Sequence, residues 1–207
     1  MKGYYHFTSN TLRDGSPIPQ VGEWLEFDGP VVPCRSGLHA SEEPFDALGF
    51  APGNLLHQVE LEGDLISHGD PVDKWCGRRR KISATIDAED LLREFARWCA
   101  QQVLHLWDAP QVVVDYLSTG DATVRDAAWD AASAAASAAA WDAASAAAMD
   151  AAWDAASAAA WAAAWAAARG AARDAARDAQ RTQFRIMVES SFLAADEGGG
   201  REKFPKR

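Results

Sequence analysis

The segment from Arg125 to Arg181 repeats every four residues, and this period limits how the second half of the chain can fold. The first position of each tetrad is large or polar, the second carries every aspartate of the segment, and the other two are almost always alanine. Alanine has the highest helix propensity, so we expect the segment to be helical. An α-helix has 3.6 residues per turn, and each tetrad therefore turns its first position by roughly 40° around the axis. The large side chains cannot stay on one side of a straight helix.

Two arrangements would keep these side chains buried. The helix can supercoil with a right hand, because the period exceeds 3.6 residues, or it can break into shorter helices that pack on one another. We favour breaks near the serine-rich tetrads. The first positions include five tryptophans, which we assign to an interface: Trp129, Trp141, Trp153, Trp161 and Trp165. Apolar surface on this scale predicts self-association, most simply as a dimer. A ligand stacked on the tryptophans is the alternative.

Charge and cysteine content exclude several classes of protein. The chain has 207 residues, with 30 Asp plus Glu against 20 Lys plus Arg, which argues against nucleic acid as a partner. Its three cysteines have spacings that suit no common zinc site, and we expect reduced thiols in a cytoplasmic protein. The first residues lack an apolar signal core, and Asp and Ser interrupt the alanine-rich run. We therefore expect no membrane partner.

The fold expected from these patterns is α+β, with a small β-rich N-terminal domain followed by an alanine- and tryptophan-rich helical region built on the four-residue repeat. Residues 1–86 form the β-rich domain, 87–120 linking helices, 121–196 the tetrad-repeat region and 197–207 a disordered tail. Gly and Pro punctuate the first domain heavily. A helix from Glu42 to Gly49 is predicted there, with Ser41 as its N-cap. Four strands are predicted: Tyr4–Thr8, Trp24–Phe27, Leu55–Leu61 and Lys81–Ile86.

A candidate ligand site combines histidines, hydroxyls and a basic run in this domain. His39 and Ser41 precede the predicted helix start, whose free N–H groups attract anions. Arginines suit bidentate contacts to phosphate. We assign seven residues to the site: Tyr5, His6, His39, Ser41, Arg78, Arg79 and Arg80. The alternative is that the histidines are hydrogen-bonded core residues and that the arginines form a solvated turn. The sequence contains no evident catalytic or metal-binding set, and we expect no cofactor.

Two resemblances to known families cover different parts of the chain. The stretches PCRSGLHAS (33–41), PFDAL (44–48) and HQVELEG (57–63) resemble an uncharacterised N-terminal domain of phage and prophage proteins, matching residues 1–85. The stretches FARWCA (95–100) and LSTGD (117–121), with the alanine tetrads after them, are similar to the helical part of putative bacterial immunity proteins. These resemblances imply a role in bacterial conflict and carry no catalytic activity.

A third similarity concerns the stretches YHFTS (5–9) and GLHAS (37–41), which look like the strand-one histidine and later serine of ADP-ribosyltransferase-type NAD-binding folds. That family also needs a catalytic acid on a later strand, for which Glu60 and Glu62 are the candidates. We favour a non-catalytic binding protein, phage- or prophage-encoded, that sequesters a nucleotide-like ligand or blocks a partner protein in anti-defence or immunity. An NAD-consuming ADP-ribosyltransferase-like enzyme and a structural oligomerisation protein are the alternatives.

Overall fold

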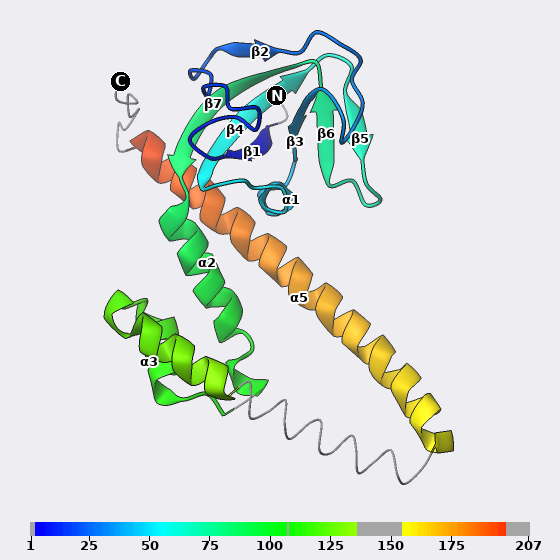
Figure 1. The fold of residues 1–207 in the computed structure, drawn as a ribbon, viewed down its shortest axis with the longest axis vertical. Helices are drawn as coiled ribbons and strands as arrows, with labels where there is room; N and C mark the ends of the chain where they lie inside the picture. Colours follow the sequence, from blue (N-terminus) through cyan, green and yellow to red (C-terminus); the bar gives the residue numbers. More distant parts are fainter. Residues whose placement is uncertain (1–2, 107, 136–154, 198–207) are drawn as a thin grey trace. The chain divides into compact units, whose positions relative to one another are not determined.

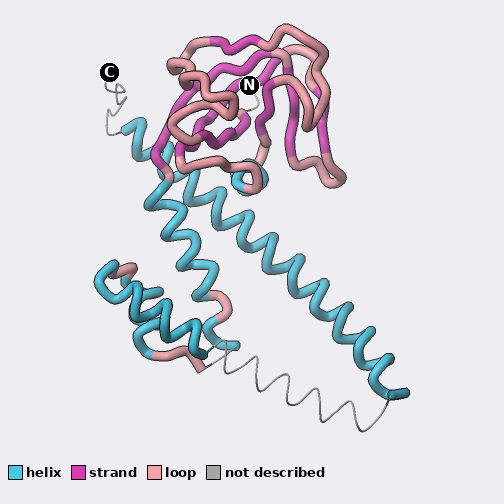
Figure 2. Tube along the Cα trace, in the orientation of Figure 1, coloured by secondary structure: helices cyan, strands magenta, loops and turns pink. Residues whose placement is uncertain are grey.

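A computed structural model describes residues 3–106, 108–135 and 155–197, and its fold is α+β as predicted (Figure 1). The chain divides into two compact units. The first, here called the sheet unit, joins Met1–Arg93 to Gln180–Arg207, and the second, the helical unit, comprises Glu94–Ala179. All the strands in the described residues lie in the sheet unit (Figure 2). The sheet unit therefore extends past residue 86, the boundary predicted from the sequence. It also includes the chain from Gln180 onward, which the sequence analysis assigned to the tetrad-repeat region and the tail.

The larger sheet contains the four strands that the sequence predicts. Its strands run antiparallel in the order β1-β4-β7-β2. Strand β7 begins before Lys81, so two arginines of the basic run belong to a strand rather than to a solvated turn. The bounds are β1 Tyr4–Thr8, β2 Trp24–Glu26, β4 Leu55–Glu62 and β7 Arg79–Asp87.

A second sheet, of three antiparallel strands in the order β3-β6-β5, was not predicted. Its strands are too short to show an alternating pattern: β3 Leu38–Ala40, β5 Ile66–His68 and β6 Lys74–Gly77. Side chains of β3 and β6 pack against one side of the larger sheet, which we call the inner face. The core there consists of Tyr4, Ala40, Val59, Leu61 and Ile82, with Ile18, Leu38 and Trp75 packed against it.

The helix predicted from Glu42 begins later, and Ser41 is not its cap. Helix α1 spans Pro44–Leu48, and the residue before it, Glu43, makes no side-chain cap bond. Proline suits the first turn of a helix and holds the preceding residue in extended backbone. The backbone of Ser41 instead pairs with Tyr5, with N–O distances of 2.9 and 2.7 Å. Pairing with β1 thus overrides the capping preference of the serine.

The end of helix α5 (Ala155–Glu197) covers the other side of the larger sheet, which we call the helix face. Phe7 and Leu56 lie opposite each other in the β1–β4 register and are buried on this face. Along α5, Phe184, Val188 and Phe192 recur every four residues and are buried as well, as in an amphipathic helix. Figure 1 shows this end of α5 beside the strands of the larger sheet.

The helical unit has a small core of its own. Val113, Leu117 and Ala128 are buried in it, and Gln101 donates a hydrogen bond of 2.6 Å to the Leu117 carbonyl. Gly120 ends α3 with a φ of 70°, the left-handed conformation that glycine adopts readily at helix C-termini. The elements are α2 (Glu89–Gln101, which crosses the boundary between the units), η1 (Leu104–Leu106), α3 (Gln111–Thr119) and η2 (Ala122–Val124).

The tetrad segment is helical wherever the structure describes it. Residues 125–135 are helical, and α5 continues without interruption from Ala155 through the last tetrads. Trp129, on the first of these helical stretches, is 73% exposed. The tetrads at Ser133 and Ser157 lie within described helix, and no predicted break is present there. The breaks predicted at the other serine tetrads, Trp141, Trp153 and the tail after residue 197 lie outside the described residues, as do the side chains of Trp161 and Trp165. None of the described helices combines the length and apolar character needed to cross a membrane.

Candidate ligand-binding site

The four basic residues from Arg78 to Lys81 have different surroundings, because successive side chains of a strand point to opposite faces. Arg79 is exposed and pairs with Glu62 at 2.6 Å. Lys81 pairs with Glu60 at 2.9 Å. Arg80 is only 7% exposed and points to the inner face, between those two neighbours. Arg80 therefore differs from Arg79 and Lys81, because it is buried on the inner face and they pair with carboxylates.

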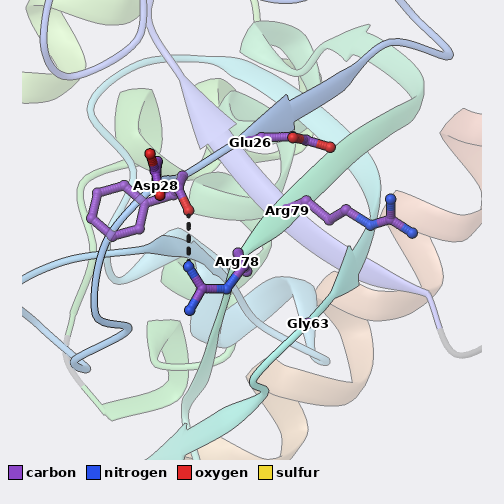
Figure 3. A pocket seen from close by; sticks show the side chains of 6 residues that line it. Glu26, Asp28, Gly63, Arg78 and Arg79 are labelled. Atoms are coloured by element: carbon purple, nitrogen blue, oxygen red, sulfur yellow. Dashed lines mark hydrogen bonds between the residues drawn. The ribbon is translucent and has the colours of Figure 1, made fainter.

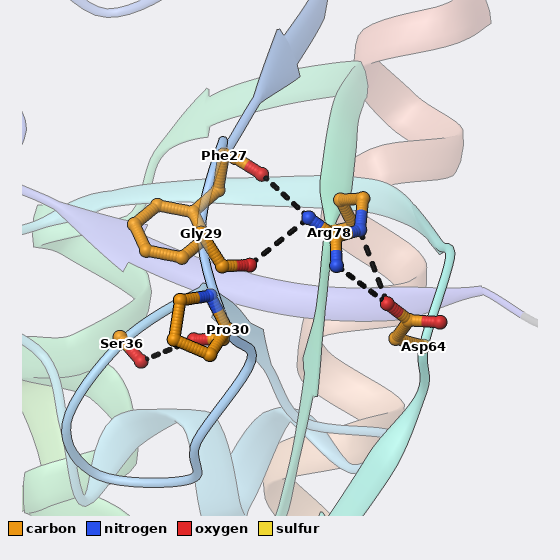
Figure 4. Close-up of polar contacts among 6 residues, drawn as sticks. All are labelled: Phe27, Gly29, Pro30, Ser36, Asp64 and Arg78. Atoms are coloured by element: carbon orange, nitrogen blue, oxygen red, sulfur yellow. Dashed lines mark hydrogen bonds and ion pairs between the residues drawn. The ribbon is translucent and has the colours of Figure 1, made fainter.

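Arg78 precedes β7 and has a structural role. Its guanidinium bonds to Asp64 at 2.7 Å and donates to the Gly29 carbonyl at 2.9 Å (Figure 4). These contacts join the loop after β2 to the turn after β4. Four of the five N–H groups of the guanidinium have protein acceptors, so Arg78 has at most one donor left for a ligand.

Arg80 has no carboxylate partner among the described residues. Its Nη1 donates to the backbone oxygen of His39 at 2.7 Å, and this is its one hydrogen bond to that part of the chain. Burial lowers the pKa of the guanidinium to about 10, so the group remains charged at neutral pH. A buried charge without a counter-charge is costly by several kcal/mol. The inner face thus holds a positive charge whose compensation the described chain does not supply.

Two histidines lie on the same face as Arg80. His6 and His57 face each other across the β1–β4 pair, with ring centroids 6.4 Å apart. His57 is fully buried, and hydrogen bonds of 2.8 Å join its two ring nitrogens to Thr8 and Thr85. These two bonds fix the orientation of the His57 ring in the sheet.

The protonation of these histidines follows from their burial and from the nearby positive charge. Burial, with a contribution from Arg80, lowers the pKa of His57 to about 4. Burial, then Arg80, His57, His39 and Arg13, lower the pKa of His6 well below its usual value. Both rings are therefore neutral at pH 7. A neutral imidazole can donate one hydrogen bond and accept another, but it cannot compensate the charge of Arg80.

His39 lies on β3 rather than before a helix, and its side chain and backbone have different roles. Its Nε2 accepts a hydrogen bond of 3.2 Å from the backbone N–H of Cys34, and its carbonyl accepts from Arg80. Burial, Lys74 and Arg80 lower the pKa of the His39 ring. The structure therefore associates three of the seven predicted site residues: His6, His39 and Arg80.

The other four predicted residues lie apart from this group. The Tyr5 side chain points to the helix face, where burial and the nearby Glu189 of α5 raise its pKa. Ser41 is buried beside β1 and lies three residues before α1. Arg78 and Arg79 line a surface hollow of about 490 Å³ instead (Figure 3).

The surface hollow does not supply a site for an anion. Besides its two arginines it is lined by Glu26, Phe27, Asp28 and Gly63. Figure 3 shows the side chains of Arg78 and Arg79 extending in different directions from the start of β7. Both guanidinium groups are already paired, one with Asp64 and the other with Glu62. Carboxylates therefore offset the positive charge at this position.

Four residues near the predicted site were missed from the sequence: Thr8, His57 and Thr85 on the inner face, and the exposed Arg13, whose charge adds to the lowering of the His6 pKa. The position of His57 could have been found from the predicted strand that begins at Leu55. His57, Val59 and Leu61 are each two residues apart, so their side chains point to the same face of the strand, and that face is buried. Thr8 has the same phase as His6 on β1. Arg13 lies in the loop after β1, and nothing in its sequence context indicates its position.

Comparison with protein families gives one match, over the N-terminal part of the chain. Residues 1–94 match a domain of unknown function, DUF7666. The match covers less than half of the 207 residues, and it includes every strand but none of the end of α5. Searches of curated proteins and of solved structures found no match. In the described residues, no group of three or more His, Cys, Asp or Glu is placed to hold a metal ion.

Proposed function

We propose that the sheet unit is a non-catalytic binding module that captures a phosphate-bearing, nucleotide-like small molecule through Arg80. The observation that carries the proposal is the contrast within the basic run. The exposed Arg79 and the half-buried Lys81 have carboxylate partners, while the buried Arg80 has only a backbone carbonyl. An anion would compensate the Arg80 charge and form charge-assisted hydrogen bonds, which are about twice as strong as neutral ones.

The surroundings of Arg80 favour such a ligand. His6 and His57 are neutral at pH 7 and add hydrogen-bonding capacity without adding an opposing negative charge. Under the family resemblances, which imply phage or prophage origin, the module would sequester a nucleotide-like ligand or block a partner protein in bacterial conflict. Glu60 and Glu62 alternate with the inward residues of β4 and are paired with Lys81 and Arg79. They lend no support to an ADP-ribosyltransferase-like reaction beside His6.

The proposal predicts that binding depends on Arg80 and not on its exposed neighbour. Titration calorimetry with inorganic phosphate, NAD, ADP-ribose and cyclic dinucleotides should detect binding of at least one of them by the wild type. Arg80→Met should abolish this binding, because the buried donor and its charge are lost. Arg79→Met is the matched control and should bind as the wild type does. Equal binding by Arg80→Met, or no binding of any of these compounds by the wild type, would contradict the proposal.

A second candidate function, self-association through the tetrad segment, is favoured by Trp129. An indole exposed to 73% is a large apolar surface left in contact with water. We expect light scattering at micromolar concentration to give a mass near twice 22.3 kDa. Trp129→Ser should shift the protein toward the monomer. A monomeric wild type would contradict this expectation, and an unchanged dimer in the variant would exclude Trp129 from the interface.

A further inference from the structure

We propose that the helix face of the sheet unit is a receptor for an amphipathic helix, and that residues 180–197 occupy it without needing their covalent connection to residue 93. The family match ends at residue 94, but the sheet unit also includes a second stretch of chain, which begins at Gln180. The intervening 94–179 segment is then an insertion with both ends fastened to one unit. Its tetrads can change in number without disturbing the sheets.

The apolar contact is extensive for so short a segment. Phe184 and Val188 are both 0% exposed, and Phe192 is 8% exposed. The Phe184 ring meets the Phe45 ring of α1 edge to face, with centroids 6.3 Å apart. Helices that bind in grooves place their apolar anchors three or four residues apart, as these three residues are. The last turns of α5 therefore have the form of a bound helical ligand.

Two arginines attach the same helix to α1 and the residue before it. Arg181 binds Asp46 with both ends of its guanidinium, at 2.6 and 2.7 Å. The Asp46 side chain is only 8% exposed, so this is a largely buried, bidentate pair. One turn later, Arg185 lies 3.7 Å from Glu43. Complementary charge thus adds to the apolar contact and orients the helix.

The apolar anchors also fix which tetrad docks. Arginine recurs every four residues before Arg181, so a helix shifted back by one tetrad would still present an arginine to Asp46. That shift would replace the buried Phe184 by Gln180. A polar amide in the place of a fully buried ring is disfavoured. The buried residue Phe184 therefore determines which arginine pairs with Asp46. The arginines alone would allow more than one register.

Cleavage of the intact chain tests the inference. A protease site is inserted between Ala147 and Ala148 of the full-length protein, which is cleaved after folding and passed over a size-exclusion column with mass detection. The two fragments should elute together. Arg181→Asp should weaken their association at least about tenfold, since it places two carboxylates together at a buried position. Arg177→Asp, one tetrad earlier and exposed, is the control and should leave the fragments associated.

A charge exchange distinguishes loss of docking from loss of folding. The double variant Asp46→Arg, Arg181→Asp restores an ion pair of reversed polarity and should recover association relative to Arg181→Asp. Separation of the wild-type fragments would overturn the inference. So would fragments that remain equally associated in Arg181→Asp, because their contact would then lie elsewhere. Failure of the double variant to recover any association would show that Asp46 is not the partner that holds the helix.

Discussion

Phe184→Ala is expected to lower the free energy of unfolding of the sheet unit by about 3–5 kcal/mol. The ring is fully buried and packs edge to face on Phe45. The substitution removes its apolar burial and leaves a cavity between α5 and α1 that rigid neighbours fill only in part. The effect should be visible in urea or thermal unfolding followed by circular dichroism.

The matched control for this substitution lies two residues along the same helix. Ile186 is 50% exposed, and Ile186→Ala should cost well under about 1 kcal/mol, as is typical of surface substitutions. Equal stability of Phe184→Ala and the wild type would mean that the end of α5 is not part of the folded sheet unit. That result would also remove the basis for helix docking.

The second large effect is a loss of stability in acid that originates at His57. Unfolded histidine binds a proton near pH 6.5, but folded His57 does so only at about pH 4. Because its folded pKa is lower, acidification between these values favours the unfolded chain. His57 should contribute about 3 kcal/mol of stability that is fully present above pH 6.5 and lost as the pH falls to 4. His6, whose pKa is also lowered, adds to the loss in the same direction.

The contribution of His57 can be separated from that of the carboxylates by comparing variants. Free energies of unfolding are measured from pH 7.5 to 4 for the wild type, His57→Gln and His68→Gln. His57→Gln should show a flatter profile over this range, because glutamine keeps hydrogen-bonding groups near Thr8 and Thr85 without titrating. His68 has a side chain 43% exposed, and its variant should follow the wild type. Parallel profiles for the wild type and His57→Gln would contradict the assignment.

The long elements of the fold could be predicted from local sequence. Strands β1, β4 and β7 have alternating or apolar runs bounded by turn residues, and α3 ends at Gly120, a glycine that caps its C-terminus. The strands β3, β5 and β6 could not be predicted, since three or four residues show no period. Ser41 was misread as a cap because its pairing with Tyr5 is a contact between distant parts of the chain.

The candidate site was only partly predictable for a related reason. The run from Arg78 to Lys81 is evident in the sequence, but only the pairing register of β7 shows that Arg80 points inward. His6 comes near Arg80 because β1 and β7 flank the same strand, β4. The apolar spacing of Phe184, Val188 and Phe192 predicts an amphipathic patch. It does not say which surface covers it, and that depends on Phe45 and Asp46 of α1.

The most direct test of the account compares the stability of the wild type and Arg80→Met with and without each of the four compounds, namely inorganic phosphate, NAD, ADP-ribose and cyclic dinucleotides. Without ligand, Arg80→Met should be as stable as the wild type or more stable, because replacing an uncompensated buried charge by an apolar side chain is neutral or favourable. With ligand at about one hundred times its dissociation constant, the wild type should gain about 2.7 kcal/mol and the variant nothing. If Arg80→Met is strongly destabilised and none of these compounds stabilises either protein, Arg80 is a structural residue and the binding proposal is wrong.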